Sequence, residues 1–431
     1  MERQDRTQHD DQLWEGIFSR PNLFAALERV RKNKGAPGID EMTVDELPDH
    51  LRQHWSGIRA KLDKGSYVPS PVKRVEIPKP GGGVRLLGIP TVLDRMIQHA
   101  IHQVLSPIFE ATFSSHSYGF RPGRSAHDAV KAARDYIETG YEYVVDMDLA
   151  KFFDTVNHDR LMAQLAKTIH DKRVLALIRS YLKTGVMLGG MVEPTEEGTP
   201  QGGPLSPLLS NIVLTELDRE LEQRGHRFVR YADDCNIYVK SQKSANRVMM
   251  SITQFVENRM SLQVNREKSA ADLVFNRTFL GFEFQKTPKG DMRIVISQKS
   301  LKRARSKLRQ ITRRNQGNSI EFIRDRVNYF VVGWTNYYGL VDWRGQLESM
   351  DSWLRRRMRQ IRWKQWKTYR NRIGNLINLG ASKHWAIKTG LSSKGCWHIA
   401  KSVPLHKTLN NAYWRDFGLK SFVQQYDRRH T

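Results

Sequence analysis

The stretch that decides the fold is Phe228-Val-Arg-Tyr-Ala-Asp-Asp-Cys-Asn-Ile-Tyr-Val239, in which two strand-like runs meet at the adjacent acids Asp233 and Asp234. Runs rich in aromatic and β-branched residues on both sides of a polar break are typical of paired strands. Aspartate is a common turn residue, so one such pair is explained by a turn alone. Two neighbouring carboxylates nevertheless repel each other, and a turn that presents both favours a bound cation.

A second strand-like stretch carries acids where a buried strand should be apolar. Tyr143-Val-Val-Asp-Met-Asp-Leu149 is mostly apolar but includes Asp146 and Asp148. A carboxylate on a buried strand is unfavourable unless a cation or a polar partner compensates its charge. Two acidic strand ends in one chain therefore favour a metal site over two ordinary turns. Aspartate oxygens suit Mg²⁺, and two such ions can activate a 3′-hydroxyl and stabilise a departing pyrophosphate.

A basic hairpin is expected ahead of these strands. Val72–Ile77 alternates as a strand does, Pro78–Gly83 forms a glycine-rich turn, and Val84–Leu87 is the returning strand. Three consecutive glycines are better explained by a plain turn than by a phosphate cradle. With its basic flanks, the hairpin is a candidate for binding a triphosphate. These flanking residues are Lys73, Arg74, Lys79 and Arg85.

The charge indicates a polyanionic partner. Lysine and arginine number 70 against 45 aspartates and glutamates, a formal net charge of +25. From Lys299 to Thr431 there are 29 basic and 7 acidic residues, so residues 1–298, with 41 and 38, carry only +3. A merely soluble, highly charged surface is the alternative, and this uneven distribution argues against it. Eight of the ten tryptophans lie in the same basic stretch; most are expected in the core, but flat rings can also stack on unpaired bases.

Composition excludes several other classes of protein. A hydrophobic content of 39% is that of a folded chain, and no apolar run approaches the roughly 20 residues of a membrane helix. Two cysteines, Cys235 and Cys396, cannot make a disulfide framework or a cysteine-rich zinc site. The polar N-terminus is unlike a signal or transit peptide. We expect a cytoplasmic location.

Helical periodicity predicts most of the remaining elements. It indicates helices over 23–32, 44–61, 94–105 and 125–139, and further helices over 301–311, 320–334 and 346–367. Basic side chains cover much of the first and last of the later three helices. A solvated basic face is the alternative, but like charges at i, i+4 spacing are unfavourable without an anion, so we favour contact with nucleic acid. The candidate contacts are Arg303, Arg305, Lys307, Arg355, Arg359 and Arg362.

Several sequence blocks surround the acids in a characteristic order. Tyr231-Ala-Asp-Asp234 follows Asp146-Met-Asp-Leu-Ala-Lys-Phe-Phe-Asp154, and Gly198-Thr-Pro-Gln-Gly-Gly-Pro-Leu-Ser-Pro207 between them is the most distinctive block. The other blocks are Asn33-Lys-Gly-Ala-Pro-Gly-Ile-Asp40, Tyr118-Gly-Phe-Arg-Pro-Gly-Arg124, Val264-Asn-Arg-Glu-Lys-Ser269, Phe279-Leu-Gly-Phe282, Gly333-Trp-Thr-Asn-Tyr-Tyr338 and Trp363-Lys-Gln-Trp366. Together they resemble the reverse transcriptase encoded by bacterial group II introns, often called the intron maturase. The resemblance spans nearly the whole chain.

The resemblance implies an α+β right-hand polymerase. Fingers and palm with an N-terminal extension would occupy residues 1–295, a helical thumb or maturase domain X residues 296–367, and a small C-terminal DNA-binding region residues 368–431. Asp148, Asp233 and Asp234 match the catalytic, metal-binding triad for two Mg²⁺ ions, with Mn²⁺ as a substitute. Asp146, two residues before Asp148, faces the same side of the strand and is expected to support the site without catalysing.

The resemblance also implies which residues meet the nucleotide. Phe153 fits the aromatic gate that would clash with a ribose 2′-hydroxyl and so favour dNTPs, with Phe152 as the alternative. The remaining candidates are Lys79 and Arg85 for the triphosphate, Gln201 for the pocket, and Lys268 for either protonating pyrophosphate or forming a structural salt bridge.

The implied function is an RNA-directed DNA polymerase that copies intron RNA into DNA for retrohoming and binds intron RNA to assist splicing. Its implied partners are group II intron RNA, an RNA template with a DNA primer, target DNA and dNTPs. It would associate with the nucleoid during integration, and no membrane partner is expected. Clustered His and Cys for a zinc-supported HNH endonuclease are absent from this sequence, which therefore resembles the short class C form. A splicing-only maturase is an alternative that the intact acids disfavour. A domesticated relative in DNA repair or phage defence would use the same chemistry.

Overall fold

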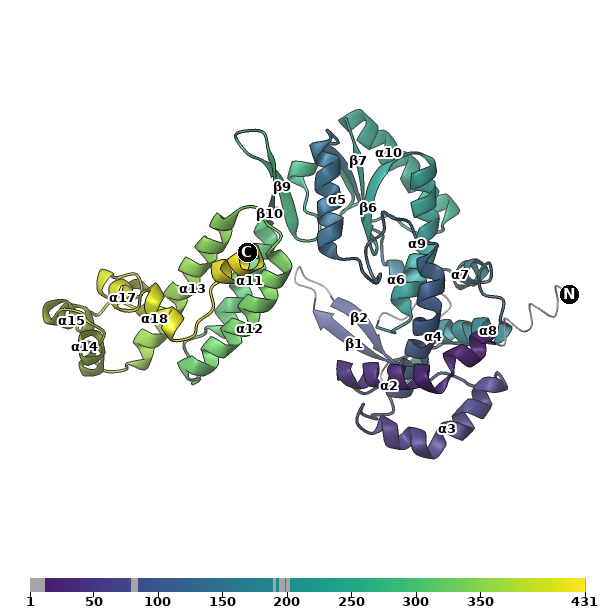
Figure 1. Cartoon of the computed structure of the whole chain (residues 1–431), viewed down its shortest axis with the longest axis horizontal. Helices are drawn as coiled ribbons and strands as arrows, with labels where there is room; N and C mark the ends of the chain where they lie inside the picture. Colours follow the sequence, from purple (N-terminus) through teal and green to yellow (C-terminus); the bar gives the residue numbers. More distant parts are fainter. Residues whose placement is uncertain (1–11, 79–83, 189–190, 194–197, 199–201, 431) are drawn as a thin grey trace. The chain divides into compact units, whose positions relative to one another are not determined.

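The computed structural model describes residues 12–78, 84–188, 191–193, 198 and 202–430 of the chain. The chain forms two compact units, Met1–Leu273 and Val274–Thr431, both drawn in Figure 1. The first unit combines sheets with helices, and the second is mainly helical. The predicted α+β class with a helical C-terminal region is confirmed. The boundary between the units falls at residue 273, and the domain limits at 295 and 367 stay predictions.

An antiparallel sheet with the order β6-β7-β3-β8 forms the centre of the first unit. Helix α5 packs against β6, and α10 packs against β3, β7 and β8. This sheet contains the predicted strands over 143–149 and 228–239, which confirms both. Its strands are β3 (Tyr143–Met147), β6 (Arg227–Tyr231), β7 (Asp234–Val239) and β8 (Ala270–Leu273).

A second sheet of the same unit has the order β2-β1-β4-β5. The predicted basic hairpin is confirmed, because β1 (Val72–Pro78) and β2 (Val84–Ile89) pair antiparallel with Pro78 opposite Val84. Strand β4 (Val186–Leu188) runs parallel to β1 and pairs with β5 (Met191–Glu193). The tip of the hairpin, with Lys79, lies outside the described residues.

Two long helices cross the core of the first unit. Along α4 the side chains of Ile97, Ala100, Ile101 and Leu105 are fully buried. Helix α9 is buried over most of its length, and its buried positions include polar side chains such as Asn211 and Asp218. The predicted helices before the acidic strands are confirmed. The helices of this unit are α2 (Arg20–Asn33), α3 (Leu47–Asp63), α4 (Val92–Glu110), α5 (Ala126–Glu138), α6 (Phe152–Thr155), α7 (His158–Leu165), α8 (Lys172–Lys183), α9 (Ser206–Gln223) and α10 (Gln242–Gln254).

The second unit begins with a short hairpin and continues as helices. The predicted helices over 301–311, 320–334 and 346–367 correspond to α11, α12 and α13 and are confirmed. In the described parts of the chain, no helix is long and apolar enough to cross a membrane. The elements of the unit are β9 (Phe282–Lys286), β10 (Met292–Ile296), α11 (Gln298–Ile311), α12 (Ile320–Tyr338), α13 (Arg344–Gln365), α14 (Tyr369–Asn378), α15 (Lys383–Gly390), α16 (Cys396–Ile399), α17 (Val403–Thr408), α18 (Asn411–Asp416) and α19 (Phe422–His430).

The last helix of the second unit returns to its central helices. Helix α19 packs against α12 and α13. Asp351 of α13 is 3% exposed, and its carboxylate accepts the backbone N–H groups of Phe422 at 2.9 Å and Val423 at 3.1 Å. These N–H groups belong to the first turn of α19, where a carboxylate caps the helix and interacts favourably with its dipole. The sequence after residue 420 is therefore anchored to α13.

Candidate active site

The strand register brings the predicted acids to the same end of strands β3 and β7. Strands β3 and β7 pair antiparallel with Met147 opposite Cys235 and Asp146 opposite Asn236. Asp148 and Asp234 stand directly beyond the Met147–Cys235 pair. The register therefore pairs the end of one predicted acidic strand with the start of the other.

The acids interact strongly through their charges. Burial of its carboxyl, together with the charges of Asp233, Asp148 and Asp146, raises the pKa of Asp234 from its usual 3.8 to about 7. The residue as a whole is exposed, so its carboxyl has protein atoms on one side and solvent on the other. The charges of the neighbouring carboxylates add to the effect of burial, because each of them repels the ionised form of Asp234. A bound cation would relieve this repulsion.

Lys268 provides the positive charge that the structure places next to the acids. Its Nζ donates to Oδ2 of Asp148 at 3.1 Å, and its side chain is 67% exposed. Ser269 holds the same aspartate from the other side, because its hydroxyl accepts the Asp148 backbone N–H at 3.0 Å. Of the two roles predicted for Lys268, the salt bridge is present in the structure, and the protonation of pyrophosphate stays a prediction.

The donor set fits a divalent cation. Within the described ranges, no three His, Cys, Asp or Glu side chains already stand close enough together to hold an ion. Repulsion between uncompensated carboxylates is a physical reason for such spacing. The groups themselves are aspartate oxygens, the ligands that Mg²⁺ prefers. Asp148 already accepts a cationic donor, and Asp234 carries a raised pKa, so both would be stabilised by a metal ion.

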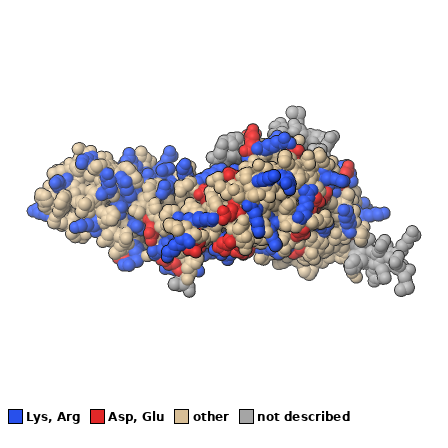
Figure 2. All heavy atoms as spheres, turned by 90° about the horizontal axis from the view of Figure 1, so that it is seen from above, with Lys and Arg blue, Asp and Glu red and all other residues tan. Residues whose placement is uncertain are grey.

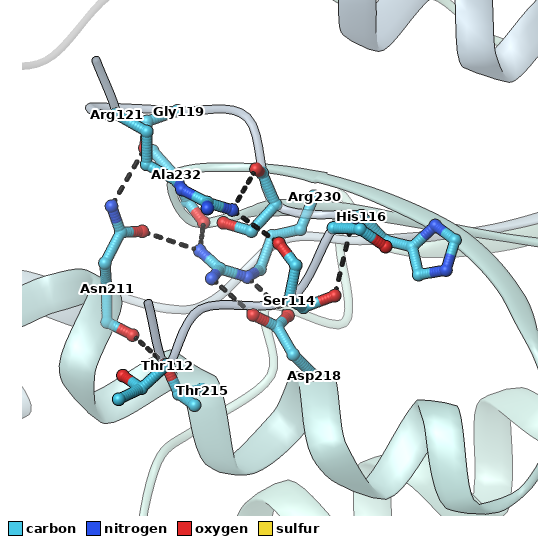
Figure 3. A network of polar contacts seen from close by, with 12 residues as sticks. Thr112, Ser114, His116, Gly119, Arg121, Asn211, Thr215, Asp218, Arg230 and Ala232 are labelled. Atoms are coloured by element: carbon cyan, nitrogen blue, oxygen red, sulfur yellow. Dashed lines mark hydrogen bonds and ion pairs between the residues drawn. The ribbon is translucent and has the colours of Figure 1, made fainter. Parts of the chain in front are cut away.

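A buried arginine supports the turn that carries Asp233 and Asp234 (Figure 3). Arg230 is completely buried, and its guanidinium binds the equally buried Asp218 of α9 through two hydrogen bonds of 2.6 Å. Its Nη1 donates to the backbone carbonyl of Ala232 at 2.9 Å. Ala232 has a φ of +57°, which is uncommon for a residue with a Cβ atom. The arginine therefore holds an unfavourable backbone conformation directly before the two acids.

The block around Gly119 packs against the same turn. A Cβ atom at Gly119 would lie 2.2 Å from the backbone nitrogen of Ala232, so only glycine allows this approach. Asn211 of α9 joins the two segments, since its amide donates to the Gly119 carbonyl at 2.9 Å and its oxygen accepts from Arg230 at 3.0 Å. Three distant blocks of sequence thus converge behind the turn that carries Asp233 and Asp234, the candidate catalytic turn.

Sequence reasoning missed Arg230, Asp218 and Asn211 as functional residues. A signal was present, since Arg230 interrupts an apolar strand and Asp218 an apolar helix face. A buried charge of this kind requires a partner. Nothing in the local pattern, however, says that each is the partner of the other.

The structure separates the two phenylalanines considered for the aromatic gate. Phe152 is 2% exposed and belongs to the core, whereas Phe153 is only partly buried. The first glycine of the distinctive block lies against the backbone of this segment, because a Cβ atom at Gly198 would be 2.8 Å from the Phe153 carbonyl oxygen. At the other end of the block, a Cβ atom at Gly202 would be 2.5 Å from the carbonyl oxygen of Gly88 in β2. Burial therefore favours Phe153 over Phe152.

Part of the predicted nucleotide pocket cannot be placed. Lys79 and Gln201 lie outside the described residues. Arg85 pairs through its backbone with Ile77, and its side chain also lies outside the described part. These three contacts stay predictions.

The predicted nucleic-acid contacts of the second unit differ in accessibility. On α11, Arg303 and Lys307 are exposed, and Arg305 is partly buried. Arg359 of α13 is only 4% exposed and donates to the backbone carbonyls of Ala400 at 2.9 Å and Leu409 at 3.4 Å. The expectation that Arg359 offers its charge to nucleic acid is therefore corrected: it joins α13 to the C-terminal helices.

The other two α13 candidates are partly buried. Arg362 donates to the hydroxyl of Tyr413 at 3.1 Å, and Arg355 lies one turn before the buried Arg359. Figure 2 shows Lys and Arg spread over the surface, with few Asp or Glu on the part formed by the C-terminal helices.

A sheet with acidic strand ends followed by a helical unit is the arrangement expected of the reverse transcriptase class, and the family comparison shows that class. Residues 77–284 match the family model described as Reverse transcriptase (RNA-dependent DNA polymerase), and this range contains the acids of the candidate site. Residues 301–378 match the model described as Group II intron, maturase-specific domain.

Known relatives agree with these matches. The chain is 33% identical over 323 residues to Protein YkfC of Escherichia coli, and the matched region covers 65% of this chain and 85% of that protein. It is 37% identical over 215 residues to the Group II intron-encoded protein LtrA of Lactococcus lactis subsp. cremoris, covering 49% of this chain and 35% of LtrA. It is 32% identical over 203 residues to a Putative COX1/OXI3 intron 1 protein of Saccharomyces cerevisiae, covering 46% of this chain and 24% of that protein. The chain belongs to the group II intron-encoded reverse transcriptase and maturase family, although it spans only about a third of LtrA.

Proposed function

We propose that this chain copies RNA into DNA, extending a DNA primer with dNTPs on an intron RNA template. The observation that carries the proposal is the register of β3 with β7, which ends at Met147 opposite Cys235 and so brings Asp148 and Asp234, with Asp233 next to it in the turn, to the same end of the strand pair. Two acidic strand ends that meet in this way have no structural purpose that would offset their repulsion. An enzyme that binds metal ions for phosphoryl transfer needs carboxylates gathered in this way, and that need accounts for the arrangement.

Each residue of the site has a role in this proposal. Asp148, Asp233 and Asp234 would hold two Mg²⁺ ions, with Mn²⁺ as a substitute. Bound there, the ions would supply positive charge that favours ionisation of the primer 3′-hydroxyl and stabilises the departing pyrophosphate. The 3′-oxygen attacks the α-phosphorus of the dNTP, and the bond from that phosphorus to the β-phosphate oxygen breaks.

Neighbouring side chains shape the same reaction. In this proposal Phe153 would clash with a ribose 2′-hydroxyl and so favour dNTPs. Lys268, exposed beside Asp148, is available to donate a proton to the pyrophosphate oxygen. Arg230 keeps the turn in place through the Ala232 carbonyl.

Binding of group II intron RNA is the second part of the proposal. The maturase-specific match over residues 301–378 and the exposed cations of α11 support it. Through this binding the chain would assist splicing, and target DNA would be engaged when the intron integrates. The strongly basic composition after residue 298 suits both polyanions.

Primer extension on a poly(rA)/oligo(dT) duplex with Mg²⁺ and dTTP tests the polymerase. Wild type should extend the primer, and Asp233→Ala should lose at least about a thousandfold in rate, the scale expected when a metal-binding group is removed from phosphoryl transfer. Asp45→Ala, which removes an exposed acid outside the site, is the matched control and should leave the rate unchanged. A folded wild type that binds RNA but extends nothing would refute the polymerase and leave RNA binding as the function.

A further inference from the structure

A polar groove lies on the first unit, away from the acids. It has a volume of about 880 Å³ and is formed by the end of α4, by α7 and the segment after it, by α9, and by the end of α10 with the turn that follows. Within α9, Glu216 and Arg219 line the groove, whereas Asn211 and Asp218 face the buried arginine behind the catalytic turn. The groove and the catalytic turn therefore use different faces of the same helix.

The groove concentrates positive charge in a part of the chain that is otherwise nearly neutral. Five basic and two acidic side chains line it, a net charge of +3, which equals the net charge of all residues 1–298. The acids are engaged locally: Arg160 pairs with Glu216 at 2.7 Å, and Arg224 pairs with Glu220 at 2.6 Å. The other three basic residues are exposed and make no ion pair with any described residue; they are Lys167, Arg219 and Arg259.

One wall of the groove has an unusual backbone. Residues Phe255–Arg259 form a π-helical turn at the end of α10, in which the Met260 N–H donates to the Phe255 carbonyl at 3.2 Å. This turn brings Asn258 and Arg259 into the lining. Single π turns are rare, less favourable than α-helix, and frequent at functional sites. The turn is an independent sign that this wall is specialised.

The remaining lining groups indicate the chemistry of the partner. Amides and hydroxyls dominate it, and they are the groups that commonly contact phosphates and sugars. Of the four apolar members, Phe109 and Ile212 are buried, Phe255 is partly buried with the guanidinium of Arg224 over its ring, and Ala163 is small. Eight lining residues carry an amide or a hydroxyl and five are basic, so a phosphodiester backbone fits better than an acidic protein surface.

We propose that this groove binds the phosphodiester backbone of folded RNA at a second site, separate from the polymerase site. Lys167, Arg219 and Arg259 neutralise phosphates, and the amides of the lining meet ribose 2′-hydroxyls, which can both donate and accept. The choice of RNA rests on the proposed function, because the chain must hold intron RNA. The groove would give the first unit its own RNA-binding site, independent of the maturase-specific region.

The test measures RNA binding while the polymerase site is filled. A labelled RNA hairpin with a blocked 3′ end is titrated against full-length chain saturated with a short oligo(rA)/oligo(dT) duplex. The combined variant Lys167→Glu, Arg219→Glu, Arg259→Glu should bind the hairpin at least tenfold more weakly. For this variant, the slope of log K against log salt concentration should be less steep by about 2–3, because each neutralised phosphate contributes about 0.7–0.9 to that slope.

Matched variants separate the groove from general charge and folding. Lys61→Glu, Lys131→Glu, Lys243→Glu makes the same charge change at exposed positions outside the lining and should bind nearly as wild type. Primer extension should be unchanged in both combined variants. Glu216→Gln frees Arg160 from its acidic partner and should tighten binding a few-fold, a direction that mere damage to the fold would not produce.

Several results would overturn the second site. These are wild-type affinity in the groove variant, an equal loss in the control variant, a parallel loss of primer extension, or equally tight binding of a DNA hairpin of the same sequence. The result is independent of the polymerase proposal. If wild type extends no primer but the groove variant alone loses RNA, the polymerase proposal fails and the groove stands.

Discussion

The buried pair behind the catalytic turn allows stability and catalysis to be separated. In Asp218→Leu the Arg230 guanidinium, which is completely buried, loses both of its 2.6 Å hydrogen bonds to carboxylate. Arginine cannot shed its proton to escape, so a charge is left in the core with two neutral acceptors. Removing one member of a buried ion pair costs about 3–5 kcal/mol. We expect the midpoint of thermal unfolding to fall by about 10 °C.

The double variant Arg230→Met, Asp218→Leu tests what the arginine does for the turn. Replacing both members by apolar side chains of similar size leaves no buried charge and should restore most of the stability. The Ala232 carbonyl still lacks its charged donor, a hydrogen bond worth about 1.5–3 kcal/mol. If that energy holds the acids in position, kcat should fall roughly 10- to 100-fold, while the KM for dTTP changes little.

Two measurements decide whether Arg230 positions the turn or only stabilises the fold. Circular dichroism follows thermal unfolding of wild type, both single variants and the double variant, and single-nucleotide extension gives kcat and KM. Recovered stability with lost kcat is the expected combination, since a purely structural pair would recover both. A double variant with wild-type kcat would refute the role of Arg230 in positioning the turn. A single Asp218→Leu variant that loses less than about 1 kcal/mol would refute the buried pair itself.

Four further outcomes follow from the site. Because the pKa of Asp234 is raised to about 7, the folded state binds this proton more tightly than the unfolded state, and the stability of the metal-free protein falls as pH rises from about 4 through 7. In thermal unfolding, Asp234→Asn should therefore be more stable than wild type by about 1 kcal/mol at pH 8 and equally stable near pH 4. The gain is modest because solvent screens the partly exposed carboxyl. Lys268→Met should lower the Mg²⁺ concentration for half-maximal extension up to about fivefold, because the exposed lysine no longer competes for its carboxylate partner; an unchanged Mg²⁺ titration would show that the pair is weak. Phe153→Val should raise incorporation of ribonucleotides relative to dNTPs in competition assays, and unaltered discrimination would remove it as the gate. Arg359→Met should lower the unfolding midpoint with little direct effect on RNA affinity, whereas Arg303→Met should weaken RNA binding at unchanged stability; the opposite pattern would contradict their difference in burial.

Much of the local structure was predictable because polarity patterns are local. The acids of the central sheet stood out as charges on apolar strands, and the register of β3 with β7 then brought Asp148 and Asp234 to the same end of the strand pair. The helices of the second unit followed from apolar periodicity alone. The cationic positions on α11 and α13 were visible too, but periodicity could not separate an exposed Arg303 from a buried Arg359.

The sequence by itself determined the class of the chain, the order of its elements and the acids of its site, because these depend on neighbouring residues and short motifs. Only the tertiary structure decided which charges became internal supports. Arg230 meets Asp218 and Asn211 across separate elements, and Gly119 reaches the same turn from a block more than a hundred residues earlier. Burial and pairing arise from the packing of distant segments, so a sequence shows that a charge needs a partner but not which partner it finds.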